Sequence, residues 1–271
     1  MILWKTKVGI KELTKNNLSL SKNRKYMFKK IALVTGANKG IGYETAKQLA
    51  KEGVTVIAAA RNVEKGKAAV EALKQQGLDV EFLKLDVDNE TDIDAAFDYI
   101  NNKYGKLDIL INNAGIQLES NSWAENTSEN IGEQVLRETL DTNFFSVVKL
   151  TSKLLPLIRK SNAGRIVNLS SILGSLNLHA DPASPIYDSK LFAYNASKTA
   201  LNAYTIHLAH ALKQTGIKVN AAHPGWVKTD MGSDAAPMNV QDGAKTSVEL
   251  ALIDENGPNG KYLHLGQELP W

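Results

Sequence analysis

The sequence predicts a single-domain α/β fold, doubly wound around a seven-stranded parallel sheet, and three observations support this prediction. From residue 31 onward, short β-branched runs alternate with longer amphipathic segments, as in successive βαβ units. The short runs are apolar almost throughout, which is typical of strands covered by helices on both faces. No change of composition divides the 271 residues into two domains.

The expected strands and helices alternate along the chain. The strands are IALVT (31–35), VTVIAAA (54–60), VEFLKL (80–85), DILIN (108–112), RIVNLS (165–170), KVNAAH (218–223) and the short KYLHL (261–265). The segments between them predict helices at about 41–52, 63–76, 90–104, 128–160, 190–215 and 240–252. Right-handed crossovers place ligands beyond the carboxyl ends of such strands, so each loop that follows a strand is a candidate site.

Composition excludes several classes of protein. With 43% hydrophobic and 23% charged residues, the chain is typical of a globular protein with a sizeable core. It contains no cysteine, which excludes disulfides, a thiolate nucleophile and cysteine-bound zinc, and which fits a cytoplasmic location. The five histidines show no metal-binding spacing, so we expect no metal site.

Charge is distributed unevenly along the chain. Residues 1–26 carry seven Lys or Arg and one acid, and the remainder carries 25 basic and 28 acidic residues. A slightly acidic body predicts no nucleic-acid partner, and the absence of a long apolar run predicts no membrane partner. Residues 1–26 lack the apolar core of a secretory signal. They are interpreted as a disordered extension, a weak targeting segment or a start-site artefact, ahead of a domain at 27–271.

A glycine-rich turn follows the first expected strand. In TGANKGIG, Gly36, Gly40 and Gly42 lead into a helix, where a tight turn lets backbone N–H groups approach a pyrophosphate. The strict G-x-G-x-x-G fingerprint is absent because residue 45 is threonine. A glycine turn without a ligand is the alternative, but the strand before it and the helix after it favour dinucleotide binding.

The end of the second strand predicts which dinucleotide binds. An NAD site normally has an acidic residue there, whereas this chain has Ala60 followed by Arg61. Arg61 can pair with the 2'-phosphate of NADP, and Lys39 of the glycine turn can supply a second positive charge. Both could be ordinary surface cations, but the sequence predicts NADP(H) as the cofactor.

A tyrosine four residues before a lysine can serve carbonyl chemistry. Hydride transfer to a carbonyl leaves an alkoxide-like oxygen that needs a proton donor, and a lysine one helical turn away favours the tyrosinate. The spacing occurs four times, at Tyr26/Lys30, Tyr43/Lys47, Tyr99/Lys103 and Tyr194/Lys198. Only Tyr194 and Lys198 follow the fifth strand, at the expected ligand-bearing edge. Tyr187 also lies there, but residue 191 is leucine.

Six motifs in order resemble those of the classical short-chain dehydrogenases/reductases, over residues 31 to about 265. They are TGANKGIG, NNAG (112–115), TN ending at Asn143, NLSS (168–171), YNASK (194–198) and HPGWVKTD (223–230). Within the family the chain is most similar to carbonyl reductases. The resemblance implies a Rossmann fold and NADPH-dependent reduction of an aldehyde, ketone or quinone.

The resemblance also implies roles for individual residues. Tyr194 is the general acid/base, Lys198 lowers its pKa and binds the nicotinamide ribose, Ser171 holds the substrate oxygen, and Asn143 supports a proton relay through water. Ser170 is the alternative to Ser171, and Asn143 could instead be a structural amide. The other implied cofactor contacts are Asn38, Ile41, Asp86, Val87, Asn113, Ala114, Gly115, Pro224, Gly225, Val227 and Thr229. Asp86 has a helix N-cap as its alternative role.

One departure from the family concerns residues 172–193, which make the interval between Ser171 and Tyr194 longer than usual. This segment is expected to be a loop or lid that walls the substrate pocket with residues 230–242, or that covers a dimer-forming helical face. The second possibility favours a monomer over a homodimer. The partner is a small carbonyl or alcohol. The alternatives are an alcohol, sugar or hydroxysteroid dehydrogenase working oxidatively, and a non-catalytic NADP-binding sensor.

Overall fold

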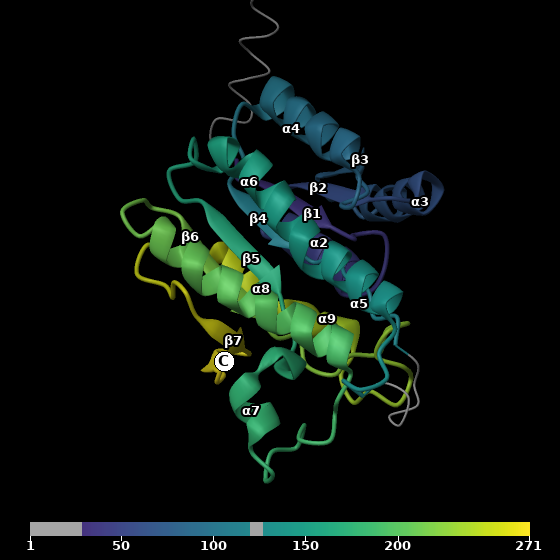
Figure 1. The fold of residues 1–271 in the computed structure, drawn as a ribbon. Helices are drawn as coiled ribbons and strands as arrows, with labels where there is room; N and C mark the ends of the chain where they lie inside the picture. Colours follow the sequence, from purple (N-terminus) through teal and green to yellow (C-terminus); the bar gives the residue numbers. More distant parts are fainter. Residues whose placement is uncertain (1–28, 120–126) are drawn as a thin grey trace, which may run out of the picture.

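The computed structural model describes residues 29–119 and 127–271 (Figure 1). The predicted extension at 1–26 lies outside these residues. Eight strands form one sheet in the order β3-β2-β1-β4-β5-β6-β7-β8. Their bounds are β1 Ile31–Thr35, β2 Thr55–Ala60, β3 Val80–Lys84, β4 Ile109–Asn112, β5 Arg165–Leu169, β6 Lys218–Ala222, β7 Tyr262–His264 and β8 Gln267–Glu268.

The seven predicted strands are confirmed and run parallel, but an eighth joins the edge. Strand β8 pairs antiparallel with β7 through a tight hairpin at Leu265 and Gly266, whose φ angles of 45° and 78° are both positive. Positive φ at both central residues suits the turns that match the twist of a hairpin. Since β8 is two polar residues long, no hydrophobic pattern indicated it.

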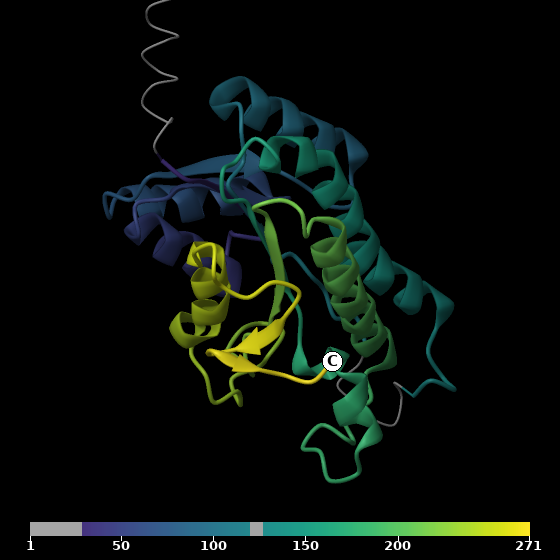
Figure 2. The ribbon, with the colours of Figure 1, turned by 90° about the vertical axis from the view of Figure 1, so that its left-hand side faces the viewer.

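Two layers of helix cover the sheet. The helices are α2 Gly40–Lys51, α3 Val63–Lys74, α4 Glu90–Tyr104, α5 Glu133–Leu140, α6 Ser146–Ile158, α7 Leu176–Ala180, α8 Phe192–Ala211 and α9 Val240–Leu252. One core lies beneath α2, α3 and α9, and the other beneath α4, α6 and α8, so the two groups take opposite faces (Figure 2). None of these helices, within the described residues, is long and apolar enough to cross a membrane.

Strand residues alternate between the two cores. In β1, Ala32 and Val34 pack into the first core, while Ile31 and Leu33 pack into the second. Successive side chains of a strand point to opposite faces, so a strand buried on both sides must be apolar at every position. This explains why the strand runs were visible in the sequence.

The helix expected over 128–160 is interrupted. It consists of α5, a π-helical turn at Asp141–Phe145 and α6. The π turn inserts one extra residue into the helical repeat and leaves Thr142 and Asn143 buried. Hydrophobic periodicity did not detect this change. The helix expected at 190–215 is α8, which is shorter at both ends.

The order of the strands fixes where a ligand can bind. Strand β1 lies between β2 and β4, so the chain reverses its direction across the sheet between β1 and β4. In open α/β sheets, ligands bind outside the carboxyl ends of the strands at such a switch point. The loops after β1, β4, β5 and β6 all end at this edge.

Candidate active site

The glycine turn after β1 is built for close backbone approach. Gly36 and Gly40 have φ angles of 64° and 56°, in the left-handed region that favours glycine. A Cβ on Gly42 would collide with the side chain of Asn113 and with the carbonyl of Gly36. No side chain caps the N-terminus of α2. Its first-turn N–H groups therefore face outward as donors for an anion.

Asn113 holds the glycine turn rather than projecting from it. Its Nδ2 donates to the carbonyl of Thr35 at 2.7 Å, and the backbone N–H groups of Asn113 and Ala114 both donate to Thr35 Oγ1 at 2.9 Å. The loop after β4 is thereby fixed to the end of β1. The predicted cofactor contacts at 113–115 lie beside those at 36–42, and the sequence did not indicate the part that Thr35 plays.

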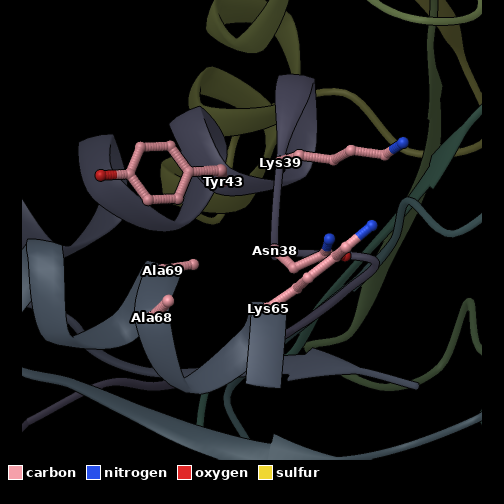
Figure 3. A pocket seen from close by; sticks show the side chains of 6 residues that line it. All are labelled: Asn38, Lys39, Tyr43, Lys65, Ala68 and Ala69. Carbon is pink, nitrogen blue, oxygen red and sulfur yellow. The ribbon is translucent and has the colours of Figure 1, made fainter. Parts of the chain in front are cut away.

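A positively charged pocket lies beside the glycine turn (Figure 3). It has a volume of about 390 Å³ and is lined by Asn38, Lys39, Tyr43, Lys65, Ala68 and Ala69. Lys39 and Lys65 extend their amines to the same side of this pocket. Lys65 belongs to the first turn of α3, four residues after Arg61. We did not predict Lys65 as a cofactor contact. Its position four residues after Arg61 could have indicated a second cation near the 2'-phosphate.

Lys39 is not free in this structure. It forms an ion pair with Asp230, and both side chains are largely exposed, at 65% and 79%. Lys39 lowers the pKa of Asp230, and Lys65 contributes to the same lowering from farther away. A phosphate that uses Lys39 must therefore compete with a carboxylate from the segment after β6.

The loop after β3 provides the predicted adenine contacts. The Asp86 carboxylate accepts the N–H of Asp88 at 3.3 Å, and the N–H of Asp86 donates to Asp92 at 2.8 Å. The N-cap of α4 is Asn89, which accepts the N–H of Asp92 at 3.2 Å. The alternative role of Asp86 as helix cap is therefore wrong. The adenine contact of Asp86 and Val87 stays a prediction.

Tyr194 lies in the first turn of α8, and its hydroxyl is close enough to Ser171 for the two to interact. Burial raises the pKa of Tyr194 to about 12, and the interaction with Ser171 opposes this rise only in part. Ser171 Oγ also accepts the N–H of Leu173 at 3.2 Å. Ser170 instead donates to Asn202 Oδ1 at 2.6 Å in the interior. The geometry therefore supports Ser171, rather than Ser170, as the serine of the site.

Lys198 lies one turn beyond Tyr194 and is 5% exposed. Its Nζ is 5.5 Å from the centroid of the Tyr194 ring and donates to the carbonyl of Leu169 at 2.8 Å. Burial lowers the pKa of Lys198 to about 8. Burial, rather than the charge of Lys198, dominates the pKa of Tyr194. The expected lowering of that pKa by Lys198 stays a prediction.

Asn143, in the π turn, connects two parts of the site. Its Nδ2 donates to the carbonyl of Ile116 and its Oδ1 accepts the N–H of Ile116, both at 2.8 Å. The same Nδ2 also donates to Ser197 Oγ at 3.0 Å. The side chain of Asn143 thus makes the contacts expected of a structural amide, which was the alternative role. The water relay through Asn143 stays a prediction.

The segment after β6 lies over the glycine turn. Gly225 has a φ of 86°, and Val227 forms a bridge with Met238. A Cβ on Gly40 would lie 3.4 Å from Thr229 Cγ2, so the predicted contacts at 224–229 and 36–42 come together across the cleft. The Thr229 hydroxyl accepts the N–H of Gly232 at 3.1 Å.

The other tyrosine–lysine pairs have structural partners. Tyr99 and Lys103 both bond to Glu81 on β3, which lies away from the cleft. Lys47 pairs with Glu44 on its own helix. Tyr26 lies outside the described residues, and Tyr187 packs beneath Lys190, 4.7 Å from ring centroid to Nζ.

The insertion after Ser171 forms a short 3₁₀ turn and α7. Ser175 Oγ and the N–H of Asn177 donate to the carbonyl of Trp271 at 3.1 and 3.0 Å. The Trp271 ring stacks on Tyr262, with centroids 5.5 Å apart. In Figure 1, α7 lies below α8 and β7. The segment expected to be a loop or lid thus contains a short helix, and its role in the pocket stays a prediction.

Large apolar side chains remain exposed in the segments that follow β4, β5 and β6. They are Leu118, Leu176, Phe192, Trp226 and Met231. These segments begin at the carboxyl-end edge of the sheet, where a ligand is expected. Within residues 29–119 and 127–271, no cluster of three or more metal-ligating side chains is found.

The chain is similar in sequence and structure to several known proteins. A sequence model of the short chain dehydrogenase family matches residues 30–239. Carbonyl reductase [NADPH] 1 of Mus musculus is 34% identical over 284 residues, covering 89% of this chain and 98% of that protein. The (+)-neomenthol dehydrogenase of Capsicum annuum is 29% identical over 299 residues, covering 86% and 95%. NADPH-bound carbonyl reductase from chicken fatty liver superposes with a TM-score of 0.77 at 27% identity, covering 90% and 99%.

Proposed function

The chain belongs to the short-chain dehydrogenase family, and from that premise we propose that it reduces the carbonyl of an aldehyde, ketone or quinone to the alcohol, using NADPH. The observation that carries the proposal is the proximity of the Tyr194 and Ser171 hydroxyls to each other and to the buried ammonium of Lys198. Two neighbouring hydroxyls can hold a carbonyl oxygen and donate a proton to it.

The cleft residues fit a phosphorylated dinucleotide. The glycine turn leaves room where a side chain at residue 42 would collide, and the outward N–H groups of α2 suit a pyrophosphate. Lys39 and Lys65 offer positive charge at the neighbouring pocket, and Arg61 follows Ala60 where an NAD enzyme would have an acid. NADPH, when bound there, supplies the hydride. Asn113 and Thr35 hold the glycine turn that would receive the dinucleotide.

The ionisation state of Tyr194 suits the donation of a proton. Its pKa of about 12 keeps the phenol protonated near neutral pH, so it can donate a proton as negative charge develops on the substrate oxygen. Lys198, with a pKa of about 8, is mostly cationic at pH 7 and stabilises the tyrosinate left behind. Oxidation of an alcohol needs the tyrosinate at the start, which burial disfavours.

The substrate is proposed to be a modestly hydrophobic carbonyl compound. The apolar side chains Leu118, Leu176, Phe192, Trp226 and Met231 are exposed in the segments that follow β4, β5 and β6. Apolar surface near the two hydroxyls would suit a substrate with an apolar body and one polar oxygen.

Tyr194→Phe tests the proposal. Turnover of NADPH with a panel of aldehydes, ketones and quinones should fall by roughly 10²- to 10⁴-fold, the usual contribution of a positioned acid. Tyr99→Phe is the matched control, because it removes a phenol from the same spacing on α4 and should leave turnover unchanged. Full activity in Tyr194→Phe would assign the proton donor elsewhere. Oxidation of alcohols without measurable carbonyl reduction would favour the dehydrogenase alternative.

A further inference from the structure

Glu119 is a buried carboxylate that none of the six motifs includes. It follows β4 and is 6% exposed. Its Oε1 accepts the backbone N–H of Ala193 at 2.7 Å, and its Oε2 accepts the backbone N–H of Tyr194 at 2.9 Å. Each oxygen of the carboxylate therefore binds one amide of the helix that carries the proposed proton donor.

These two amides need an acceptor from outside the helix. The first N–H groups of an α-helix have no intrahelical partner, and an N-cap side chain usually accepts from the second or third residue. The N-cap of α8 is Leu191, whose side chain has no acceptor, and Ala193 and Tyr194 are the second and third residues of the helix. Glu119 therefore supplies the cap from a segment about 74 residues earlier.

Three other helices of the protein are capped by the residue that precedes them. Asn62, Asn89 and Asn239 each accept an N–H of the helix that they precede, namely α3, α4 and α9. The cap of α8 differs in being both long-range and anionic. Hydrogen bonds to a carboxylate are shorter and stronger than those to a neutral acceptor, and negative charge is favoured at a helix N-terminus.

The segment that carries Glu119 also forms the cofactor side of the cleft. Its Ile116 pairs with the Asn143 amide through both N–H and carbonyl. A Cβ on Gly115 would lie 3.6 Å from Lys198 Nζ. Gln117 Nε2 donates to the carbonyl of Glu119 at 2.7 Å, which fixes the end of this segment. Glu119 thus ties the predicted cofactor loop directly to the residue that bears the phenol.

We propose that Glu119 is a positioning residue, which sets the position of the Tyr194 phenol relative to the loop at 113–116 by capping the first turn of α8. This inference rests on the proposed function, because it matters to turnover only if Tyr194 donates the proton. Loss of the cap leaves two amides without an acceptor and frees the first turn to move away from the loop. A shift of about 1 Å in a reacting group can cost on the order of 10²-fold in rate.

The test compares Glu119→Ala and Glu119→Gln with the unaltered enzyme. With a carbonyl substrate and NADPH, kcat should fall by about 10- to 100-fold in Glu119→Ala. The fall should be smaller in Glu119→Gln, which keeps one acceptor oxygen. The KM for NADPH should change by less than about 2-fold, because the cofactor contacts remain. Hydrogen exchange at the amides of residues 192–195 should become faster in Glu119→Ala.

A relocated cap distinguishes positioning from general stability. Adding Leu191→Asp to Glu119→Ala places a carboxylate at the N-cap of α8, and both kcat and amide protection should recover to within about 3-fold of the original. Asn89→Ala is the matched control, because it removes a cap from α4 and should lower stability without lowering kcat. If Glu119→Ala does not fold, Glu119→Gln and its Leu191→Asp double variant carry the same comparison.

Three outcomes would overturn the proposal. The first is a kcat within 2-fold of the original in Glu119→Ala despite faster exchange in α8. The second is an equal loss of kcat in Asn89→Ala. The third is a failure of the relocated cap to recover activity while it recovers protection. The exchange readout does not depend on turnover, so a failure of Tyr194 as proton donor would be recognised separately, by an active Tyr194→Phe.

Discussion

Gly174 gives a sharp test of how the site is held together. It ends the 3₁₀ turn that follows Ser171, and its carbonyl accepts from Thr199 Oγ1 at 3.0 Å and from Asn202 Nδ2 at 3.3 Å. A Cβ at this position would lie 2.8 Å from the carbonyl carbon of Lys198, 2.9 Å from its Cβ and 3.0 Å from its carbonyl oxygen. The turn that carries Ser171 and the helix that carries Lys198 therefore touch backbone to backbone.

Gly174→Ala should force these two elements apart by about 0.5 Å, because ordinary contacts of this kind begin near 3.4 Å. Overpacking of a well-packed interior costs about 1–3 kcal/mol. For a chain of this size that corresponds to a fall in melting temperature of roughly 3–10 °C. A displacement of half an ångström between Ser171 and Lys198 should also lower kcat by about 10-fold, scaled from the loss expected for a full ångström.

The measurement combines thermal unfolding with turnover well below the melting temperature. Gly132→Ala is the matched control, since a Cβ there meets nothing within 4 Å. Ala in place of Gly at this N-cap should cost less than about 1 kcal/mol of stability and should leave kcat unchanged. If Gly174→Ala melts and turns over like Gly132→Ala, the close contact with Lys198 does not hold the site, and the reasoning is refuted.

Two further predictions concern charge. Arg61→Ala should narrow the preference for NADPH over NADH by about 10-fold, consistent with the loss of one charged hydrogen bond to the 2'-phosphate. Arg159→Ala, at the exposed end of α6, is the control and should leave this preference unchanged. If kcat/KM for NADPH relative to NADH is unchanged in Arg61→Ala, Arg61 does not belong to the cofactor site. Burial lowers the pKa of Lys198 from 10.5 to about 8, so the unfolded chain retains this proton over pH 8–10.5 while the folded chain loses it. The contribution of Lys198 to stability should therefore rise with pH over this window. The free energy of unfolding, measured with urea at pH 7.5 and 10, should rise more with pH in the unaltered protein than in Lys198→Met. An equal change in the two proteins would contradict the prediction.

Local patterns determined much of the fold. The parallel strands and the glycine turn followed from residues adjacent in sequence, because a strand buried on two faces must be apolar and a tight turn beside an anion must be glycine. The choice of Tyr194 and Lys198 also needed their position after the fifth strand. Arg61 was chosen from its position after the second strand, and its contact with a 2'-phosphate stays a prediction. The structure adds Lys65 in the pocket beside the glycine turn.

Tertiary structure decided how these residues are held. The choice of Ser171 over Ser170 depends on which hydroxyl lies beside Tyr194. The hydrogen bond from Asn143 to Ile116 depends on a π turn that hydrophobic periodicity does not reveal. Glu119 reaches the start of α8 from the other side of the cleft. Such contacts join atoms far apart in the chain, so they follow from the packing of whole elements and not from any short stretch of sequence.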